Sequence, residues 1–161
     1  MMSDDLDLGM DMNLDDLDLD LDLDLDFDLD DLSLGMDDLR SRVMVIDDDA
    51  GTLRNIKSIL DGVYVVSVAN SGKKALDLLA IEKPDVILLD YEMPMMNGPE
   101  TMQKIRMKPG FKDTPIIFLT GVNDRSQIAA ALALRPAGYL LKPVNQNKLL
   151  MTILDALNGG A

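Results

Sequence analysis

From residue 42 onward, five short apolar runs alternate with segments of helical periodicity, and this alternation most constrains the fold. The runs cover residues 43–46, 63–68, 86–89, 116–119 and 139–141. The first helix pattern ends at Gly62. The next three cover residues 71–82, 99–107 and 124–134, and a fifth follows the last apolar run and ends at Leu157. Strict alternation predicts a parallel sheet with right-handed crossovers and helices on both faces. We therefore expect an α/β, doubly wound, five-stranded parallel sheet.

The third run is followed at once by turn residues. Val86 to Leu89 is wholly apolar, as in a strand buried on both faces, and it leads into Asp90. Met-Pro at 93–94 and Asn-Gly at 97–98 interrupt the backbone. Asp90 is therefore predicted at the carboxyl edge of the sheet, where ligands bind in open α/β folds.

Other strand ends carry residues that complement Asp90. The first run ends in Asp47, Asp48 and Asp49, the fourth in Thr120 and the fifth in Lys142. Carboxylates at close range repel unless a cation lies between them, and oxygen ligands of this kind favour Mg²⁺. A hydroxyl, an ammonium and Mg²⁺ around one carboxylate suit a phosphoryl group.

The charge of the chain is concentrated in one segment. Sixteen of the 29 acidic residues lie in residues 1–39, which hold no Lys or Arg; the rest of the chain carries 13 acidic and 15 basic residues. That balance argues against nucleic-acid binding. The absence of Cys and His excludes thiol and imidazole chemistry within the chain. No apolar run or signal sequence indicates membrane insertion or export, so we expect a cytoplasmic protein.

Residues 1–40 form an acidic, low-complexity tail, and residues 41–161 the predicted domain. Asp and Leu alternate almost strictly from Asp15 to Leu32. Rows of like charge disfavour a strand, so the composition favours disorder. The alternatives are an acidic-hydrophobic interaction segment and, less favoured, a calcium site. Such a tail could also fold back over Arg125, Arg135 and Lys148.

Four motifs together resemble the receiver domain of two-component response regulators. They are Ile46 with the three aspartates that follow it, Leu-Leu-Asp-Tyr-Glu-Met-Pro-Met-Met-Asn-Gly at 88–98, Pro-Ile-Ile-Phe-Leu-Thr-Gly at 115–121, and Gly-Tyr-Leu-Leu-Lys-Pro at 138–143. The resemblance covers residues 42–158. It implies the flavodoxin-like (βα)5 receiver fold and a function in a phosphorelay. Because no output module follows Leu157, we expect a stand-alone receiver.

The resemblance also implies a role for each strand-end residue. Asp90 would accept a phosphoryl group from a histidine kinase or phosphotransfer protein. Asp47, Asp48, Asp90 and the backbone carbonyl of Glu92 would bind Mg²⁺.

Lys142 and Thr120 would hold phosphoryl oxygens, with Lys142 and Pro143 joined by a cis peptide. Thr120 and Tyr139 would form the switch. The fourth helix, fifth strand and fifth helix would then contact an unknown downstream protein. The chain would catalyse only its own phosphorylation and dephosphorylation.

Some positions keep two interpretations or depart from the family pattern. Asp49 fits a helix N-cap as well as a metal ligand. Pro136-Ala137 stands where Gly-Ala is more usual, which predicts a reshaped end of the fourth helix. Glu92 lies beside the acceptor and could affect how a hydrolytic water approaches.

Two other functions fit parts of the pattern. Residues 47–53 also resemble the first motif of haloacid dehalogenase-type phosphatases, which would use Asp47 as the nucleophile. Ala50 interrupts that motif, and no acidic motif follows Lys142. A flavodoxin-like binder of a phosphorylated cofactor would need a Gly-rich phosphate loop after the first strand, where three carboxylates stand instead.

Overall fold

In a computed structural model of the chain, the described residues are 39–121 and 125–159. The chain divides into two units, Met1–Leu39 and Arg40–Ala161, and every element named below belongs to the second. The predicted disorder of the acidic tail, and its predicted contact with basic residues, concern residues 1–38, which lie outside the described part.

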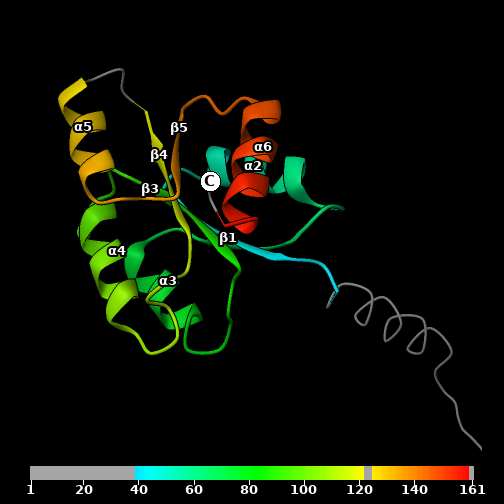
Figure 1. Ribbon diagram of the computed structural model, residues 1–161, viewed down its shortest axis with the longest axis horizontal. Coiled ribbons are helices and arrows are strands. Elements are labelled where there is room, and N and C mark those ends of the chain that lie inside the picture. The colour runs from blue at the N-terminus through cyan, green and yellow to red at the C-terminus, as the bar shows by residue number, and fades with distance from the viewer. Residues whose placement is uncertain (1–38, 122–124, 160–161) are drawn as a thin grey trace, which may run out of the picture. The chain divides into compact units, whose positions relative to one another are not determined.

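The second unit contains the predicted five-stranded parallel sheet (Figure 1). Its strands are β1 (Arg42–Ile46), β2 (Val65–Ala69), β3 (Val86–Asp90), β4 (Ile116–Thr120) and β5 (Gly138–Leu141). They lie in the order β2-β1-β3-β4-β5, and each pair of neighbours is parallel. The prediction of a flavodoxin-like, doubly wound receiver fold is confirmed.

Helices cover both faces of the sheet. They are α2 (Ala50–Leu60), α3 (Gly72–Leu78), α4 (Gly98–Met107), α5 (Arg125–Ala133) and α6 (Gln146–Leu157). Each helix within the described residues falls short of the length or the apolarity that a membrane span requires.

Alternate residues of the central strands supply two separate cores. Val43 and Val45 of β1 pack with apolar residues of α2 and α6 on one face. Met44 and Ile46 point to the other face, with residues of α3, α4 and α5. Because β1, β3 and β4 are covered on both sides, their side chains are almost wholly buried, which explains the continuous apolar runs in the sequence.

Two element boundaries differ from the sequence prediction by more than one residue. The second strand begins at Val65 rather than residue 63, because Gly62 adopts a left-handed conformation (φ 93°) and turns the chain first. The second predicted helix ends at Leu78 rather than residue 82. The amides of Ala80 and Ile81 donate to carbonyls three residues earlier, so a tight turn replaces the last helical turn.

The end of α5 is shaped by the residues before Pro136. The helix stops at Ala133, and Arg135 adopts a left-handed backbone conformation (φ 57°). A residue that precedes proline is disfavoured in the right-handed helical region, so the helix cannot continue through Arg135. The chain then enters β5 at Gly138.

Candidate functional site

The parallel register of strands β1 and β3 places two acidic residues next to each other. Ile46 of β1 pairs with Leu89 of β3, so the residues that follow, Asp47 and Asp90, lie side by side at the carboxyl edge. The amide of Asp47 donates to the carbonyl of Ala69 at 3.1 Å, which continues the β1–β2 ladder to the carboxylate. Backbone pairing therefore fixes the main-chain positions of Asp47 and Asp90.

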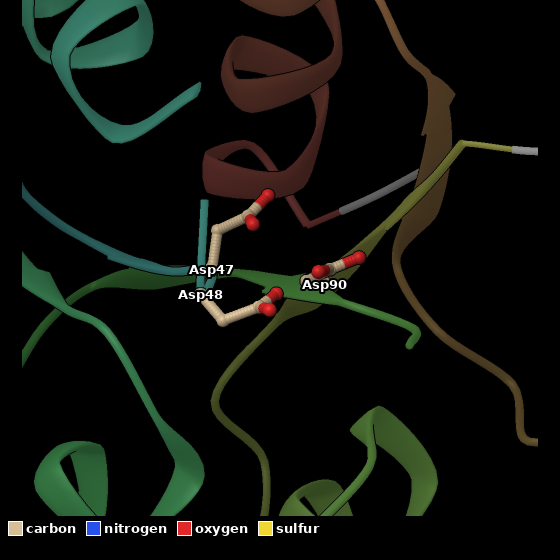
Figure 2. Close-up of side chains that lie close together, drawn as sticks. All are labelled: Asp47, Asp48 and Asp90. Atoms are coloured by element: carbon tan, nitrogen blue, oxygen red, sulfur yellow. The ribbon is translucent and has the colours of Figure 1, made fainter. Parts of the chain in front are cut away.

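Three carboxylates gather at this edge (Figure 2). One oxygen each of Asp47, Asp48 and Asp90 lies within 4.8 Å of the others. Asp47 and Asp90 are buried, with 0% and 4% of their surface exposed, whereas Asp48 is exposed. The cluster is therefore open to solvent on the side of Asp48 and closed beneath Asp47.

Lys142 bridges the two buried carboxylates. Its Nζ lies 2.7 Å from Oδ2 of Asp47 and 3.3 Å from Oδ1 of Asp90. The Lys142 amide donates to the carbonyl of Thr120 at 2.8 Å, which holds the residue against the end of β4. The peptide from Lys142 to Pro143 is cis, as predicted. Side chains from β1, β3 and the end of β5 thus meet although they are far apart in sequence.

Burial and nearby charges shift the pKa values of Asp90 and Lys142. Burial, followed by the nearby Asp47 carboxylate, raises the pKa of Asp90 to about 7, against the opposing effect of the Lys142 ammonium. Burial alone would lower the pKa of Lys142, but the carboxylates of Asp47 and Asp90 outweigh it, and the pKa is raised. The site holds more negative charge than one ammonium neutralises.

The donor set fits a hard divalent cation. Oδ2 of Asp47 is buried and accepts no hydrogen bond from the described residues, although the Lys142 ammonium lies close to it. That ammonium offsets the charge of this oxygen, but one ammonium does not balance three carboxylates, and a second cation would relieve the remaining repulsion. Three carboxylate oxygens within 4.8 Å of one another could bind the same ion, and carboxylate oxygens are ligands that Mg²⁺ prefers.

Asp49 acts as a helix cap. Its Oδ2 accepts hydrogen bonds from the Thr52 amide at 3.0 Å and the Thr52 hydroxyl at 2.7 Å, at the N-terminus of α2. These hydrogen bonds, above all that from the hydroxyl, lower the pKa of Asp49. Of the two interpretations of this residue, the geometry favours the N-cap.

The loop after β3 is held tightly against Asp90. The Glu92 amide lies 3.4 Å from Oδ1 of Asp90, and the Gly98 amide donates to the Tyr91 carbonyl at 2.8 Å. A Cβ at Gly98 would lie 2.6 Å from the carbonyl oxygen of Asp90, so only glycine allows this approach. Asn97 and Glu100 then form a capping box that begins α4. The predicted role of the Glu92 carbonyl as a metal ligand stays a prediction.

Thr120 and Tyr139 occupy neighbouring strands in different surroundings. Thr120 ends β4 and is 1% exposed, whereas Tyr139 in β5 is 38% exposed. The Thr120 hydroxyl donates to Oε1 of Gln127 at 3.0 Å, and Nε2 of Gln127 donates to Oε2 of Glu92 at 2.8 Å. Sequence reasoning missed Gln127, because nothing in the local pattern of α5 marks one polar residue as facing the sheet edge.

Comparison with known proteins places the chain in a family. The family model for the response regulator receiver domain matches residues 43–154, which is most of the chain and includes every strand-end residue described above. The chain belongs to the response regulator receiver domain family. The receiver assignment leaves the haloacid dehalogenase alternative without support.

The curated relatives that this chain matches are longer proteins. The chain is 38% identical over 109 residues to a protein-glutamate methylesterase/protein-glutamine glutaminase of Trichodesmium erythraeum, covering 65% of this chain and 30% of that protein. It is 33% identical over 122 residues to the transcriptional regulatory protein YdfI of Bacillus subtilis, covering 74% and 56%. The chain thus spans only part of each relative's length.

A solved receiver structure shares the fold along nearly its whole length. The chemotaxis response regulator CheY4 of Vibrio cholerae is 31% identical, with a TM-score of 0.67, and the match covers 73% of this chain and 98% of that one. The receiver fold therefore accounts for the second unit of this chain.

Proposed function

We propose that this receiver domain accepts a phosphoryl group on Asp90 from a histidine kinase or a phosphotransfer protein, with Mg²⁺ as cofactor. The observation that carries the proposal is the position of Lys142, whose ammonium contacts both Asp47 and Asp90 at the exposed edge of the sheet. A phosphoryl group on Asp90 would lie between this cation and the carboxylate cluster. The arrangement provides an acceptor and charge neutralisation in one place.

The chemical step is an in-line displacement at phosphorus. An oxygen of the ionised Asp90 carboxylate forms the new P–O bond as the P–N bond of a phosphohistidine breaks, and the released imidazole nitrogen takes a proton from solvent. Lys142 and Thr120 stabilise negative charge on the phosphoryl oxygens. Asp47, Asp48, Asp90 and the Glu92 carbonyl would hold Mg²⁺, which supplies further neutralisation of those oxygens when bound.

Signalling would proceed through Thr120, Tyr139 and the surface beside them. The phosphoryl group draws the Thr120 hydroxyl towards Asp90, and the half-exposed Tyr139 ring turns inward in response. Leu141, like Tyr139, is partly exposed on β5, so apolar surface is available for a partner between α5 and α6. We infer that the output is contact with a downstream protein in the cytoplasm, without nucleic-acid binding.

We infer that this unit catalyses only its own phosphorylation and dephosphorylation. Within the described residues, the only group of acidic side chains placed to hold a metal is the one around Asp90. The methylesterase named above matches this chain over only 30% of its own length, so its activity is not transferred to this chain.

Intact-mass analysis tests the proposal. The full chain is incubated with acetyl phosphate and Mg²⁺, beside Asp90→Asn and Asp47→Asn variants. We expect one added phosphoryl group on the wild type, and none on Asp90→Asn or without metal. Release of free phosphate that needs Asp47 and tolerates Asp90→Asn, with no adduct on the wild type, would contradict it.

A further inference from the structure

Gln127 joins two residues that flank the acceptor carboxylate. It lies in the first turn of α5, Thr120 ends β4, and Glu92 is in the loop after β3. The Thr120 hydroxyl donates to the side-chain oxygen of Gln127 at 3.0 Å, and the side-chain nitrogen donates to Glu92 at 2.8 Å. A single amide therefore connects three separate elements around Asp90.

The chemistry of the three groups fixes the direction of each hydrogen bond. An ionised carboxylate only accepts, so Glu92 requires the NH₂ group of Gln127 to face it. The carbonyl oxygen of the amide must then face Thr120, and it can only accept. Thr120 consequently acts as the donor, and its one hydroxyl hydrogen is directed at Gln127.

A hydroxyl has one hydrogen, so its donor role is exclusive. A phosphoryl oxygen on Asp90 is also an acceptor, and Thr120 cannot donate to it while donating to Gln127. The Thr120 side chain is almost fully buried, so water is hardly available to it as another hydrogen-bond acceptor. The phosphorylated state must therefore break the contact between Thr120 and Gln127.

The same contact ties α5 to the sheet edge. Among the nine residues of α5, only Ala131 is buried, and an alanine contributes little apolar surface. The polar link from Gln127 to Thr120 and Glu92 thus contributes to holding the first turn of the helix. Its release would loosen α5 at the end nearest the site.

We propose that Gln127 is a positioning residue that holds the Thr120 hydroxyl in the unphosphorylated state and opposes phosphorylation of Asp90. This inference rests on the function proposed above. Gln127 sets the balance between the two states by competing with the phosphoryl group for one hydrogen. Removing its acceptor oxygen should favour the phosphorylated state. The resulting increase in affinity for a phosphoryl group should depend on the Thr120 hydroxyl.

The test measures binding of beryllofluoride, a phosphoryl mimic, to the full chain in the presence of Mg²⁺. Gln127→Met keeps the length of the side chain and removes its strong acceptor; Gln127→Leu is a second variant. Gln103→Met makes the same change on an exposed position of α4 and serves as the matched control. Each variant is titrated by amide NMR, alone and combined with Thr120→Val.

We expect both Gln127 variants to bind beryllofluoride about two- to tenfold more tightly than the wild type, the range for one net hydrogen bond. Gln103→Met should bind like the wild type. In the Thr120→Val background, Gln127→Met should change affinity by less than about twofold.

Three results would overturn the inference. Unchanged or weaker binding by both Gln127 variants would show that the amide does not compete with the phosphoryl group. An equal gain with and without the Thr120 hydroxyl would show that Gln127 acts by another route. Failure of the wild type itself to bind beryllofluoride would overturn the proposed function, and the competition together with it.

Discussion

The ammonium of Lys142 lies 2.7 Å from the buried carboxylate of Asp47, although the two residues follow the fifth and the first strand of the sheet. The same ammonium lies 3.3 Å from Asp90. Lys142 therefore acts as an internal counter-ion in a site that also suits a divalent cation. A metal ion and this ammonium compete for the same carboxylate charge, which determines how the site responds to substitution.

Replacing Lys142 by methionine should separate metal binding from phosphoryl transfer. The Lys142→Met variant loses a cation that repels Mg²⁺, so we expect its Mg²⁺ affinity to rise by about threefold or more. Phosphorylation by acetyl phosphate should nevertheless fall by at least about 100-fold, because the charge on the phosphoryl group is no longer neutralised. Isothermal titration calorimetry measures the first effect and intact mass the second. Weaker Mg²⁺ binding by the variant would contradict the competition.

The metal-free protein should lose stability as the pH rises from about 4 to 7. Burial and Asp47 raise the pKa of Asp90 to about 7 in the folded state, so the native protein keeps a proton there that the unfolded chain has released. The stabilisation from this proton is complete below pH 4 and disappears as the pH passes 7. Asp90→Asn removes this pH-dependent loss, on the order of 2 kcal/mol. Urea unfolding in a chelator at pH 5 and pH 8 gives both values, and equal pH dependence in the two proteins would disprove the assignment.

Mg²⁺ should stabilise the folded protein through Asp47 and not through Asp49. At a concentration about 100 times its dissociation constant, the ion should add about 2.7 kcal/mol to the free energy of unfolding of the wild type. Asp47→Asn should lose most of this gain. Asp49→Asn preserves a good N-cap and should keep the full response to Mg²⁺. Thermal unfolding with and without chelator measures the stabilisation by Mg²⁺ in the wild type and both variants. Loss of this stabilisation in Asp49→Asn would show that Asp49 is a metal ligand.

Gly98 should tolerate no side chain. A Cβ there would lie 2.6 Å from the carbonyl oxygen of Asp90 and 2.8 Å from Cα of Tyr91, so Gly98→Ala must displace the loop that supports the acceptor. We expect a loss of about 1 to 3 kcal/mol in the free energy of unfolding, together with slower phosphorylation.

Gly51→Ala is the matched control, since the nearest atom to its Cβ would be Oδ2 of Asp49 at 3.6 Å. Gly51 lies in the first turn of α2, and alanine there should stabilise the protein by about 0.4 to 1 kcal/mol through the lower entropy of the unfolded chain. A loss of stability equal to that of Gly98→Ala would contradict the steric explanation.

The strand-end residues could be placed from sequence because parallel pairing itself brings them together. Buried apolar runs mark β1, β3 and β4, and the residues after them must share one edge whatever the helices do. Asp47, Asp90 and Lys142 therefore meet as the pattern predicts. The choice between cap and ligand for Asp49 could not be made from sequence, because it depends on where its side chain points.

Gln127 shows the limit of the same reasoning. Its contacts with Thr120 and Glu92 depend on how α5 is rotated about its axis and where the helix begins. The Ala-rich sequence of α5 has no clear apolar stripe that would fix this rotation. Tertiary packing alone decides which of its polar residues reaches the site.

The most direct test of the central claim is to locate the phosphoryl group on the chain. The protein is treated with acetyl phosphate and Mg²⁺, then with borohydride, which reduces an aspartyl phosphate to homoserine, and peptides are sequenced by mass spectrometry. Our account predicts homoserine at position 90 only, and none when the metal is chelated. Homoserine at position 47 would instead contradict the receiver mechanism and identify Asp47 as the nucleophile.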